Sequence, residues 1–367
     1  MQNDNQGLPC VFRILAMNRR DFLQPRHLAH GAGQMLGALA SLGGTGVSPV
    51  ADTTLLLHQR HRAMATQFEI ILPFGTPGAA DMGQEAFELL DALEEQMTVY
   101  RDSSEISRLN RRAFAGPVRV EYRLFALLEA AARIHRDTEG AYDITAGALI
   151  KAWGFFRGPR RVPDETERAA AREKVGMQWL TLDAERRTAR FQRPGLEINL
   201  GSIGKGYALD RLARLLSAEW GVARMLLHGG TSSVYAKGCP PDEERGWQVA
   251  ILHPWDRQRR LARVWLRDRA LGTSAATHQH LEYNGQKLGH LLDPRTGWPA
   301  SGIASVSVLA ASAAEADALS TAFYVGGLEL VQRYRDSHSG IAAIVLPEEE
   351  GAEPIVMGLS PDDFALN

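Results

Sequence analysis

The stretch from Leu196 to Ala208 reads LEINLGSIGKGYA, in which a strand, a glycine-rich turn and the start of a helix follow one another. Leu196–Leu200 has the pattern of a strand, and leucines at 209, 212 and 216 recur at the spacing of a helix. A turn at such a junction presents backbone N–H groups and the positive end of a helix, which suit a phosphate. The spacing Gly201-x-x-Gly204-x-Gly206 fits neither a Walker A loop nor a dinucleotide-binding fingerprint, so this turn alone indicates only a candidate anion site.

Along the rest of the chain, strands and helices come in groups, without the regular alternation of a doubly wound sheet. Strands are expected at residues 67–72, 179–182, 189–191, 225–228, 247–252, 305–309 and 342–346, and helices at 79–99, 124–134 and 313–325. The pair Asn284-Gly285 predicts a tight hairpin. This grouping favours an α+β fold.

The composition of the 367-residue chain is that of a globular protein, with 45% hydrophobic and 23% charged residues. The 41 basic and 43 acidic residues give a net charge of −2, so no overall basic field is available to bind nucleic acid. Two cysteines, Cys10 and Cys239, are too few for a disulfide scaffold or a cysteine-rich zinc site. The sequence also lacks an apolar run of about 18 residues, the length that a membrane-spanning helix needs.

Residues 1–52 differ from the rest and are expected to be an export signal with a flexible spacer. The pair Arg19-Arg20, followed by Phe22-Leu23, resembles a twin-arginine signal. A weakly apolar stretch at 33–42 and a Gly/Ser/Pro spacer at 43–49 complete the order that such a signal needs. This predicts a periplasmic protein, cleaved from its signal or retained at the membrane surface, whose folded part is residues 53–367. The alternative is a disordered tail that contains a chance arginine pair.

Four segments place small and polar residues where strands meet helices, the usual location of a ligand site. The first is residues 140–147, in which Asp143 offers a fixed acceptor, although taken alone an ordinary helix end with a buried Asp explains it better. The second is the glycine-rich turn itself, to which Lys205 adds a point charge.

The third segment combines residues 272–274 with residues 289–297, whose Pro294 and Gly297 predict a turn. His290 lies just before that turn and is a candidate general base or phosphate partner, whereas a lone histidine is more often structural. In the fourth segment, Asp317 and Thr321 are four residues apart and share one helix face. Their oxygens suit a hard cation such as Mg²⁺, and the competing interpretation is an acidic first turn of a helix.

Each segment is weak alone, but their order along residues 60–346 resembles that of the ApbE family, the FAD:protein FMN transferases. The residues that carry this resemblance are Ala141–Thr145 with Trp153-Gly154, Gly204–Ala208, Gly229-Gly230, Gly272–Ser274, His290 with Asp293–Gly297, and Ala316–Ala318 with Thr321. The resemblance implies a T-fold-like α+β architecture of two intimately packed halves with FAD in the cleft between them. It also implies a reaction in which FMN passes to a Thr or Ser of an acceptor flavoprotein and AMP leaves.

The resemblance further implies a role for particular residues. Those implied to contact FAD are Met64, Tyr100, Ala141, Tyr142, Asp143, Asn199, Lys205, Thr273, Ser274 and His290. Mg²⁺ is implied to lie between the backbone carbonyl of Ser202 and the side chains of Asp317 and Thr321. His290 and Asp317 are implied to be catalytic, His290 as a base beside the pyrophosphate.

Three positions depart from the family pattern. Asn199 stands where Asp is usual, Thr231 where Asn or Asp is common, and Ala275 where Gly is common. The Asp317–Thr321 pair and His290 are retained, so activity is expected, and the sequence leaves open whether the three departures change FAD affinity or acceptor choice. Two alternatives remain open: an Mg²⁺-dependent FAD pyrophosphatase that gives free FMN and AMP, and a non-catalytic FAD-binding protein.

Overall fold

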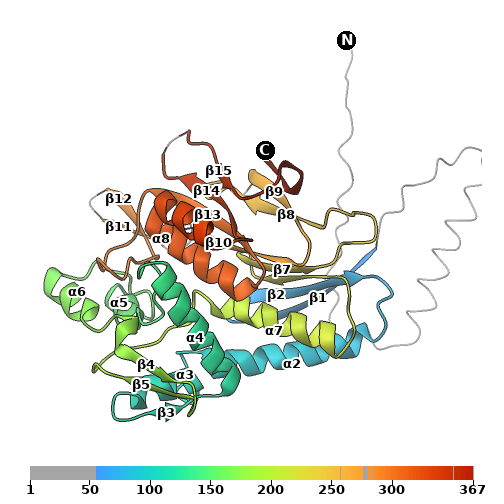
Figure 1. Cartoon of the computed structure of the whole chain (residues 1–367). Helices are drawn as coiled ribbons and strands as arrows, with labels where there is room; N and C mark the ends of the chain where they lie inside the picture. The colour runs from blue at the N-terminus through green and yellow to red at the C-terminus, as the bar shows by residue number, and fades with distance from the viewer. Residues whose placement is uncertain (1–54, 257, 276–279, 284, 350, 367) are drawn as a thin grey trace, which may run out of the picture. The chain divides into compact units, whose positions relative to one another are not determined.

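An eight-stranded antiparallel sheet organises the protein (Figure 1). The computed structural model describes residues 55–256, 258–275, 280–283, 285–349 and 351–366, so the predicted export signal lies outside the described residues. The strand order is β1 (Leu56–Ala63), β2 (Thr66–Pro73), β6 (Met225–Gly229), β7 (Ser233–Lys237), β10 (Arg269–Ala275), β13 (Ile303–Ala310), β14 (Ala342–Pro347) and β15 (Ile355–Met357). Because sequential strands are mostly neighbours, the sheet is built largely from hairpins, and β10 is inserted beside β7 after a long excursion of the chain.

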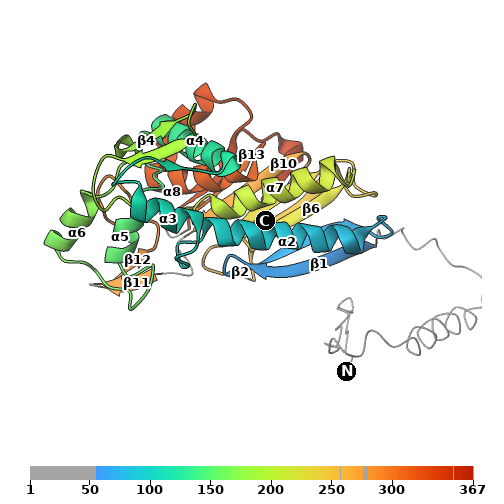
Figure 2. The same ribbon diagram turned by 90° about the horizontal axis from the view of Figure 1, so that it is seen from below.

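Three long helices, α2 (Ala79–Met97), α7 (Gly204–Ala218) and α8 (Ala313–Ser337), pack on one face of this sheet (Figure 2). Their buried residues recur every three or four positions, as Met82, Ala86, Leu90 and Leu93 do in α2, which gives each helix one apolar face toward the sheet. Helix α8 contains a kink at Gly327, whose φ of 74° is non-helical. The main hydrophobic core lies between these helices and the sheet.

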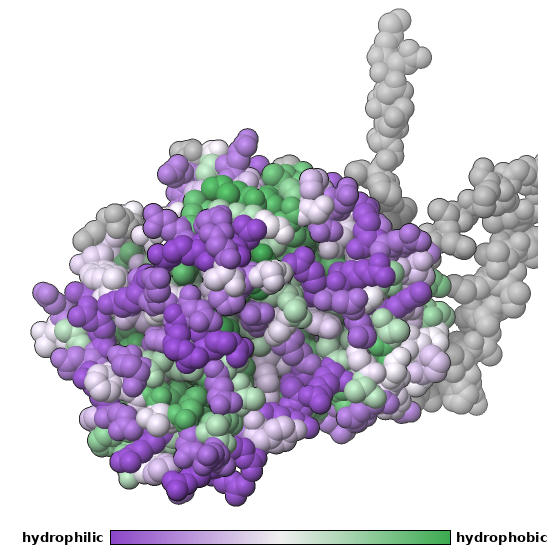
Figure 3. Space-filling view, in the orientation of Figure 1, coloured by the Kyte–Doolittle hydropathy of each residue, from purple (hydrophilic) through white to green (hydrophobic). Residues whose placement is uncertain are grey.

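The opposite face of the large sheet carries a three-stranded sheet in the order β16 (Phe364–Leu366), β9 (Arg260–Leu266), β8 (Trp247–Leu252). Along β8 buried and exposed residues alternate, with Val249 and Ile251 inside, so only one face of this sheet contacts the core. A second hydrophobic core fills the space between the two sheets. Figure 3 shows a hydrophobic patch at the upper rim of this region, where Figure 1 draws β14 and β15, within a mostly hydrophilic face.

A further group of helices and short strands lies beside the ends of α2, α7 and α8, at the lower left of Figure 1. It consists of α3 (Glu105–Arg112), α4 (Tyr122–Asp137), α5 (Gly147–Ala152), α6 (Glu165–Arg172), the 3₁₀ turn η1 (Met177–Trp179) and a sheet of β3 (Val118–Arg119), β5 (Thr188–Phe191) and β4 (Leu180–Asp183). The hairpin β11 (His280–Tyr283) and β12 (Gln286–Gly289) is next to α5 and α6 in the figure. A second 3₁₀ turn, η2 (Pro361–Asp363), precedes β16.

The predicted mixed fold is confirmed, and so are most of the expected elements. One expected strand is wrong: Leu196–Leu200 is not a strand, since of these residues only Glu197 forms a bridge, an isolated one to Ala146. Helix α8 also extends well beyond the expected end at residue 325. The contacts of residues 54–367 form one compact unit, so the division into two halves stays a prediction. Within the described residues, no helix is long and apolar enough to cross a membrane.

Candidate functional site

A cavity of about 480 Å³ collects nearly all the site residues that the sequence singles out. Loops that follow α2 and α4, the N-terminal turn of α7, the end of β10 and the first turns of α8 all contribute to it. The predicted residues that line it are Tyr100, Ala141, Tyr142, Asp143, Asn199, Ser202, Lys205, Thr273, Ser274, His290, Asp317 and Thr321. Thr231 and Ala275, two of the positions that depart from the expected pattern, line it as well.

Two glycines allow α8 to approach close enough to bring Asp317 into the cavity. A Cβ at Gly206 of α7 would lie 2.0 Å from the carbonyl oxygen of Ala313, and one at Gly272 of β10 would lie 2.4 Å from the backbone of Ala316. Both contacts are with backbone, which cannot move aside as a flexible side chain can. The absence of a side chain at these two positions is therefore what sets the depth at which Asp317 lies.

The N-terminus of α8 is held by the side chain of Asp210 on α7. Its carboxylate accepts hydrogen bonds from the backbone N–H of Ala313 at 2.7 Å and of Ala314 at 2.9 Å, and from the Ser312 hydroxyl at 2.7 Å. These are N–H groups that a helix leaves without an internal partner, and a carboxylate is favoured at this end by the helix dipole. Asp210 thus fixes α8 against α7 one turn before Asp317.

Asp317 is buried in the cavity wall, with 6% of the residue exposed. Its carboxylate accepts hydrogen bonds from the Ser233 hydroxyl at 2.7 and 2.9 Å and from the N–H of Gly206 at 2.7 Å. Burial raises the pKa of Asp317 above its ordinary value, and the charge of Lys205 together with these two donors opposes the rise. A positive ion beside Asp317 would favour its charged form.

The residues around Asp317 offer the oxygen ligands that the predicted Mg²⁺ site needs. The carboxylate of Asp317 can accept about four hydrogen bonds, so donors from Ser233 and Gly206 leave acceptor capacity. The Thr321 hydroxyl donates to the carbonyl of Asp317 at 3.3 Å, one turn earlier in the helix, and Ser202 lines the same cavity. Among the described residues, no cluster of three or more His, Cys, Asp or Glu could hold a metal. A single carboxylate suits Mg²⁺, which keeps waters or phosphate oxygens in its shell.

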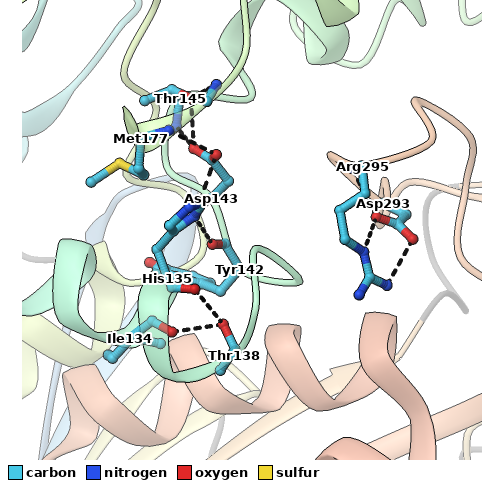
Figure 4. A network of polar contacts seen from close by, with 10 residues as sticks. Ile134, His135, Thr138, Tyr142, Asp143, Thr145, Met177, Asp293 and Arg295 are labelled. Atoms are coloured by element: carbon cyan, nitrogen blue, oxygen red, sulfur yellow. Dashed lines mark hydrogen bonds and ion pairs between the residues drawn. The ribbon is translucent and has the colours of Figure 1, made fainter. Parts of the chain in front are cut away.

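Asp143 lies in the cavity wall, but its carboxylate points into the protein (Figure 4). One oxygen accepts from the backbone N–H and hydroxyl of Thr145 at 2.7 and 2.6 Å, and the other accepts from the N–H of Met177 at 3.2 Å and lies 3.4 Å from His135 Nδ1. Only 3% of the Asp143 side chain is exposed. Its role is to shape the loop that presents Ala141 and Tyr142, which agrees with the interpretation of this segment as an ordinary helix end with a buried Asp.

The glycine-rich turn of residues 199–206 forms one side of the cavity. The side-chain oxygen of Asn199 accepts from the N–H of Gly201 at 2.9 Å, an Asx turn that holds the backbone in shape. An amide preserves this acceptor, so the departure from Asp does not disrupt the turn. Lys205 follows in the first turn of α7 and makes no ion pair with a carboxylate among the described residues, which leaves its charge available to a ligand.

Thr273 and Ser274 line the cavity at the end of β10, but they point to opposite faces of the sheet, as neighbours in a strand do. Ser274 contacts the Ser320 hydroxyl at 2.8 Å and the Thr321 hydroxyl at 3.4 Å on α8. Thr273 contacts the Ser307 hydroxyl of β13 at 2.8 Å. Ser274 therefore belongs to the Asp317 side of the sheet, and Thr273 to the side of the second core.

His290 lies between β12 and a rigid turn at residues 293–297. Arg295 donates to both carboxylate oxygens of Asp293 at 2.9 Å (Figure 4), and the indole N–H of Trp153 donates to the carbonyl of Gly297 at 3.0 Å. The Arg295–Asp293 bonds stiffen the turn, and the Trp153 bond anchors it to the end of α5. The His290 ring is half-buried, lines the cavity and meets Phe155 edge-on with ring centroids 6.4 Å apart.

The outer rim of the cavity is aromatic. The Tyr100 ring stacks on Phe156 with centroids 4.7 Å apart, and the Arg157 guanidinium lies over both rings. Tyr100 is 54% exposed, so a large part of its ring is accessible to a planar ligand.

Met64 is the one predicted site residue that does not line this cavity. It occupies, with Ala65, the two-residue turn between β1 and β2, where both residues have positive φ (50° and 58°), and its side chain packs on the main core. The turn lies next to Gly230, where an added Cβ would lie 2.4 Å from the Thr66 hydroxyl. The turn that carries Met64 thus lies close in space to Gly230, which precedes the lining residue Thr231, but Met64 itself does not line the cavity.

Sequence reasoning missed Ser233 and Asp210, which hold Asp317 and α8. Neither residue lies in a recognisable motif, and the partners of the Ser233–Asp317 bond are 84 positions apart. The only sequence signal for these two residues was their position next to a predicted motif. Ser233 follows the Gly229-Gly230 pair, and Asp210 follows the glycine-rich turn within the same helix.

Comparison with known proteins identifies the family of the chain. A family model described as the ApbE family matches residues 64–345. The FAD:protein FMN transferase of Klebsiella pneumoniae (strain 342) is 30% identical over 329 residues, covering 86% of this chain and 92% of that protein. The protein of the same name from Salmonella typhimurium (strain LT2) is 33% identical over 284 residues, covering 74% and 79%.

Solved structures of ApbE proteins resemble this chain in fold. The flavin transferase ApbE from Vibrio cholerae superposes with a TM-score of 0.73 at 28% identity, covering 83% of this chain and 98% of that one. The ApbE protein from Thermotoga maritima superposes with a TM-score of 0.75 at 24% identity, covering 83% and 97%, which bears on the fold alone. The resemblance expected from the order of the six motifs is confirmed.

Proposed function

The chain belongs to the ApbE family, and from this premise we propose that it is an FAD:protein FMN transferase that acts on a Thr or Ser of an acceptor flavoprotein. The observation that carries the proposal is the buried Asp317, held by Ser233 and Gly206 in a cavity that Lys205 and His290 also line. This arrangement places an oxygen ligand, a cation and an imidazole around one space, as the cleavage of a pyrophosphate requires.

In the proposed reaction, the acceptor hydroxyl oxygen attacks the phosphorus that belongs to the FMN half of FAD. A new P–O bond to the acceptor forms, the P–O bond to the AMP phosphate breaks, and AMP leaves with the bonding electron pair. The hydroxyl proton is lost to a base, for which His290 is the candidate in the cavity. FAD and acceptor thus become FMN–acceptor and AMP, with no oxidant or reductant.

The chain's own residues act mainly by binding and orientation. Lys205 and the N-terminal end of α7 attract the pyrophosphate, which carries adjacent negative charges. Tyr100, at the exposed rim, offers a ring on which the flavin can stack. Burial of the inner cavity strengthens each of these electrostatic interactions relative to water.

We assign the Mg²⁺ of the proposed reaction to Asp317, Thr321 and the backbone carbonyl of Ser202. Bound there, Mg²⁺ would neutralise charge on the pyrophosphate and stabilise the leaving phosphate. The support for this assignment is a buried carboxyl whose acceptor capacity is not exhausted by Ser233 and Gly206.

We also propose that the protein is exported by a twin-arginine-type signal and works in the periplasm, in solution or at the membrane surface. The support is the Arg19-Arg20 and Phe22-Leu23 order within residues 1–52. Fusion of residues 1–52 to a reporter protein that is exported only through the twin-arginine route tests this proposal. Loss of export on replacing both arginines by lysine is expected, and unchanged export would contradict it.

The activity is tested by incubating the full chain with FAD, Mg²⁺ and a pool of short peptides, each with one central Thr between random residues. Mass spectrometry follows both the peptides and AMP. We expect some peptides to gain FMN in the presence of Mg²⁺ and none in the presence of EDTA, with one AMP per labelled peptide. AMP and free FMN without labelled peptide would instead establish the pyrophosphatase alternative, and retained FAD with neither product would establish a binding protein.

A further inference from the structure

A second hollow of about 400 Å³ adjoins the cavity and shares four lining residues with it, Thr231, Ser232, Thr273 and Ala275. We call it the β8 groove, because residues 249–254 of β8 and its extension form one side. The other side is the face of the large sheet that turns away from the long helices, since Val234 and Leu271 line the groove and belong to the second core. The groove therefore reaches the cavity from the opposite face of the sheet.

The groove runs along the edge of β8 rather than over one face of it. Side chains alternate between faces along a strand, and here consecutive residues, both the buried Val249 and Ile251 and the exposed Ala250 and Leu252, line the same hollow. Strand β8 is the end strand of its sheet, with β9 on its other side. An end strand leaves about half of its backbone N–H and C=O groups without a ladder partner, so it can pair with a further strand.

The lining of the groove selects the chemistry of such a strand. The described residues that line it include no Asp, Glu, Lys or Arg; the polar ones are small hydroxyl residues and two histidines. Burial lowers the pKa of His228, one of these two, which keeps its ring neutral at physiological pH. At the outer end of the groove, Leu252 is 44% exposed and Trp255, just beyond it, is 56% exposed. An uncharged, extended peptide with small side chains fits this lining.

The groove and the cavity share one wall, where β10 runs past the end of β7. The ladder between the two strands ends at the pair Gly272–Ser233, and the next residue, Thr273, bonds by its N–H to the carbonyl of Ser232 at 2.7 Å. The last residues of β10 then have no partner on that side within the described chain. A side chain of a strand in the groove can therefore point toward the cavity beside Thr231 and Ser232.

From this placement we infer that the β8 groove is the docking site of the acceptor protein. An uncharged extended segment of the acceptor adds to the edge of β8 and directs its Thr or Ser hydroxyl between the β6–β7 turn and the end of β10, into the cavity. The inference rests on the proposed transferase activity and specifies its partner surface. FAD enters from the side of Tyr100, so the two substrates approach the pyrophosphate from different faces of the sheet.

The test uses a peptide that the wild-type protein labels in the pool experiment. Ala250→Trp places a large side chain at an exposed position that lines the groove, and Gln248→Trp is the matched control, on the same face of β8 but outside the groove. For Ala250→Trp we expect the KM for the peptide to rise by about tenfold or more, which corresponds to the loss of about 1.4 kcal/mol of binding. The half-saturating FAD concentration stays unchanged, and Gln248→Trp behaves as the wild type.

A second measurement does not depend on a variant that folds. Amide hydrogen exchange of the wild-type holoenzyme is measured with and without a variant of that peptide in which Val replaces the acceptor Thr. Slower exchange at residues 247–252 is expected. If the Ala250→Trp variant labels the peptide with the wild-type KM, or if exchange in β8 does not change, the docking site in the groove is overturned. The proposed transferase activity is not affected by either result. A wild-type protein that labels no peptide would instead overturn the proposed function, and the docking site with it.

Discussion

The inner and outer ends of the cavity are built in different ways. At the inner end, Asp317 is buried and fixed by Ser233, Gly206 and the Asp210 cap of α8. At the outer end, Tyr100 is exposed and held by stacking on Phe156 and by Arg157. The comparison teaches that the buried charge and the fixed geometry lie at the place where a pyrophosphate would react. The rim offers area and adaptability instead, so changes at the inner end should cost far more than equal changes at the rim.

The largest effect is expected from Gly206→Ala. A glycine-to-alanine change inside a helix normally stabilises it by about 1 kcal/mol, but here the new Cβ would lie 2.0 Å from the Ala313 carbonyl. We expect the variant to lose about 1–3 kcal/mol or more of unfolding free energy, measured by urea unfolding, and to lose FAD binding. Gly116→Ala, where no atom lies within 4 Å of the added Cβ, is the control and should be neutral.

Ser233→Ala should have the next largest effect. The change removes a hydroxyl that donates to both oxygens of a buried carboxylate, which costs about 1.5–3 kcal/mol for a charged acceptor. We expect a rise in the Mg²⁺ concentration needed for half-maximal activity or a fall in kcat, together with lower stability. Ser107→Ala, a buried serine whose hydroxyl lies 3.5 Å from a neutral carbonyl, is the matched control. Equal effects of the two changes would contradict the special role of Ser233.

The pH dependence of stability should reveal the buried carboxylate. Because the pKa of Asp317 is raised in the folded state, the folded protein takes up a proton at a higher pH than the unfolded chain does. The resulting stabilisation is full below the ordinary pKa of 3.8 and is lost as pH rises through the folded value. In EDTA, we expect the wild type to gain stability relative to Asp317→Asn as pH falls from 7 toward 4. A pH-independent difference between their unfolding free energies would exclude a raised pKa.

The smallest effect is expected at the rim. Tyr100→Ala removes a stacking surface that is worth about 0.5–1.5 kcal/mol, and the exposed position tolerates the loss without unfolding. The half-saturating FAD concentration should rise severalfold while kcat stays unchanged, and Tyr100→Phe should restore binding. A large fall in kcat would show that the rim takes part in the chemistry.

Sequence patterns predicted the large elements well because their apolar faces are regular, as in α2 and β8. Strand β1 was missed since its sequence, LLHQRHRA, is polar at an edge of the sheet and shows no apolar alternation. The expected strand at 196–200 was wrong because alternation indicates an extended chain but not a partner, and only Glu197 forms a bridge.

The location of the site was predictable from the sequence, but the orientation of its side chains was less so. Twelve of the predicted residues line one cavity, because the ordered motifs carry the family's arrangement. Sequence could not show that the Asp143 carboxylate turns toward Thr145 and Met177, nor that Ser233 holds Asp317, because these contacts depend on how distant segments pack. Local spacing predicts which residues share a helix face, and packing decides which group each side chain meets.

The contrast between the two ends is tested most directly by single-turnover rates of AMP release at saturating FAD, Mg²⁺ and labelled acceptor peptide. We predict that Asp317→Asn, nearly isosteric and uncharged, lowers this rate by about a hundred- to a thousandfold, whereas Tyr100→Ala releases AMP at the wild-type rate. Wild-type AMP release by Asp317→Asn would contradict the account, because it would mean that the buried carboxylate takes no part in cleaving the pyrophosphate.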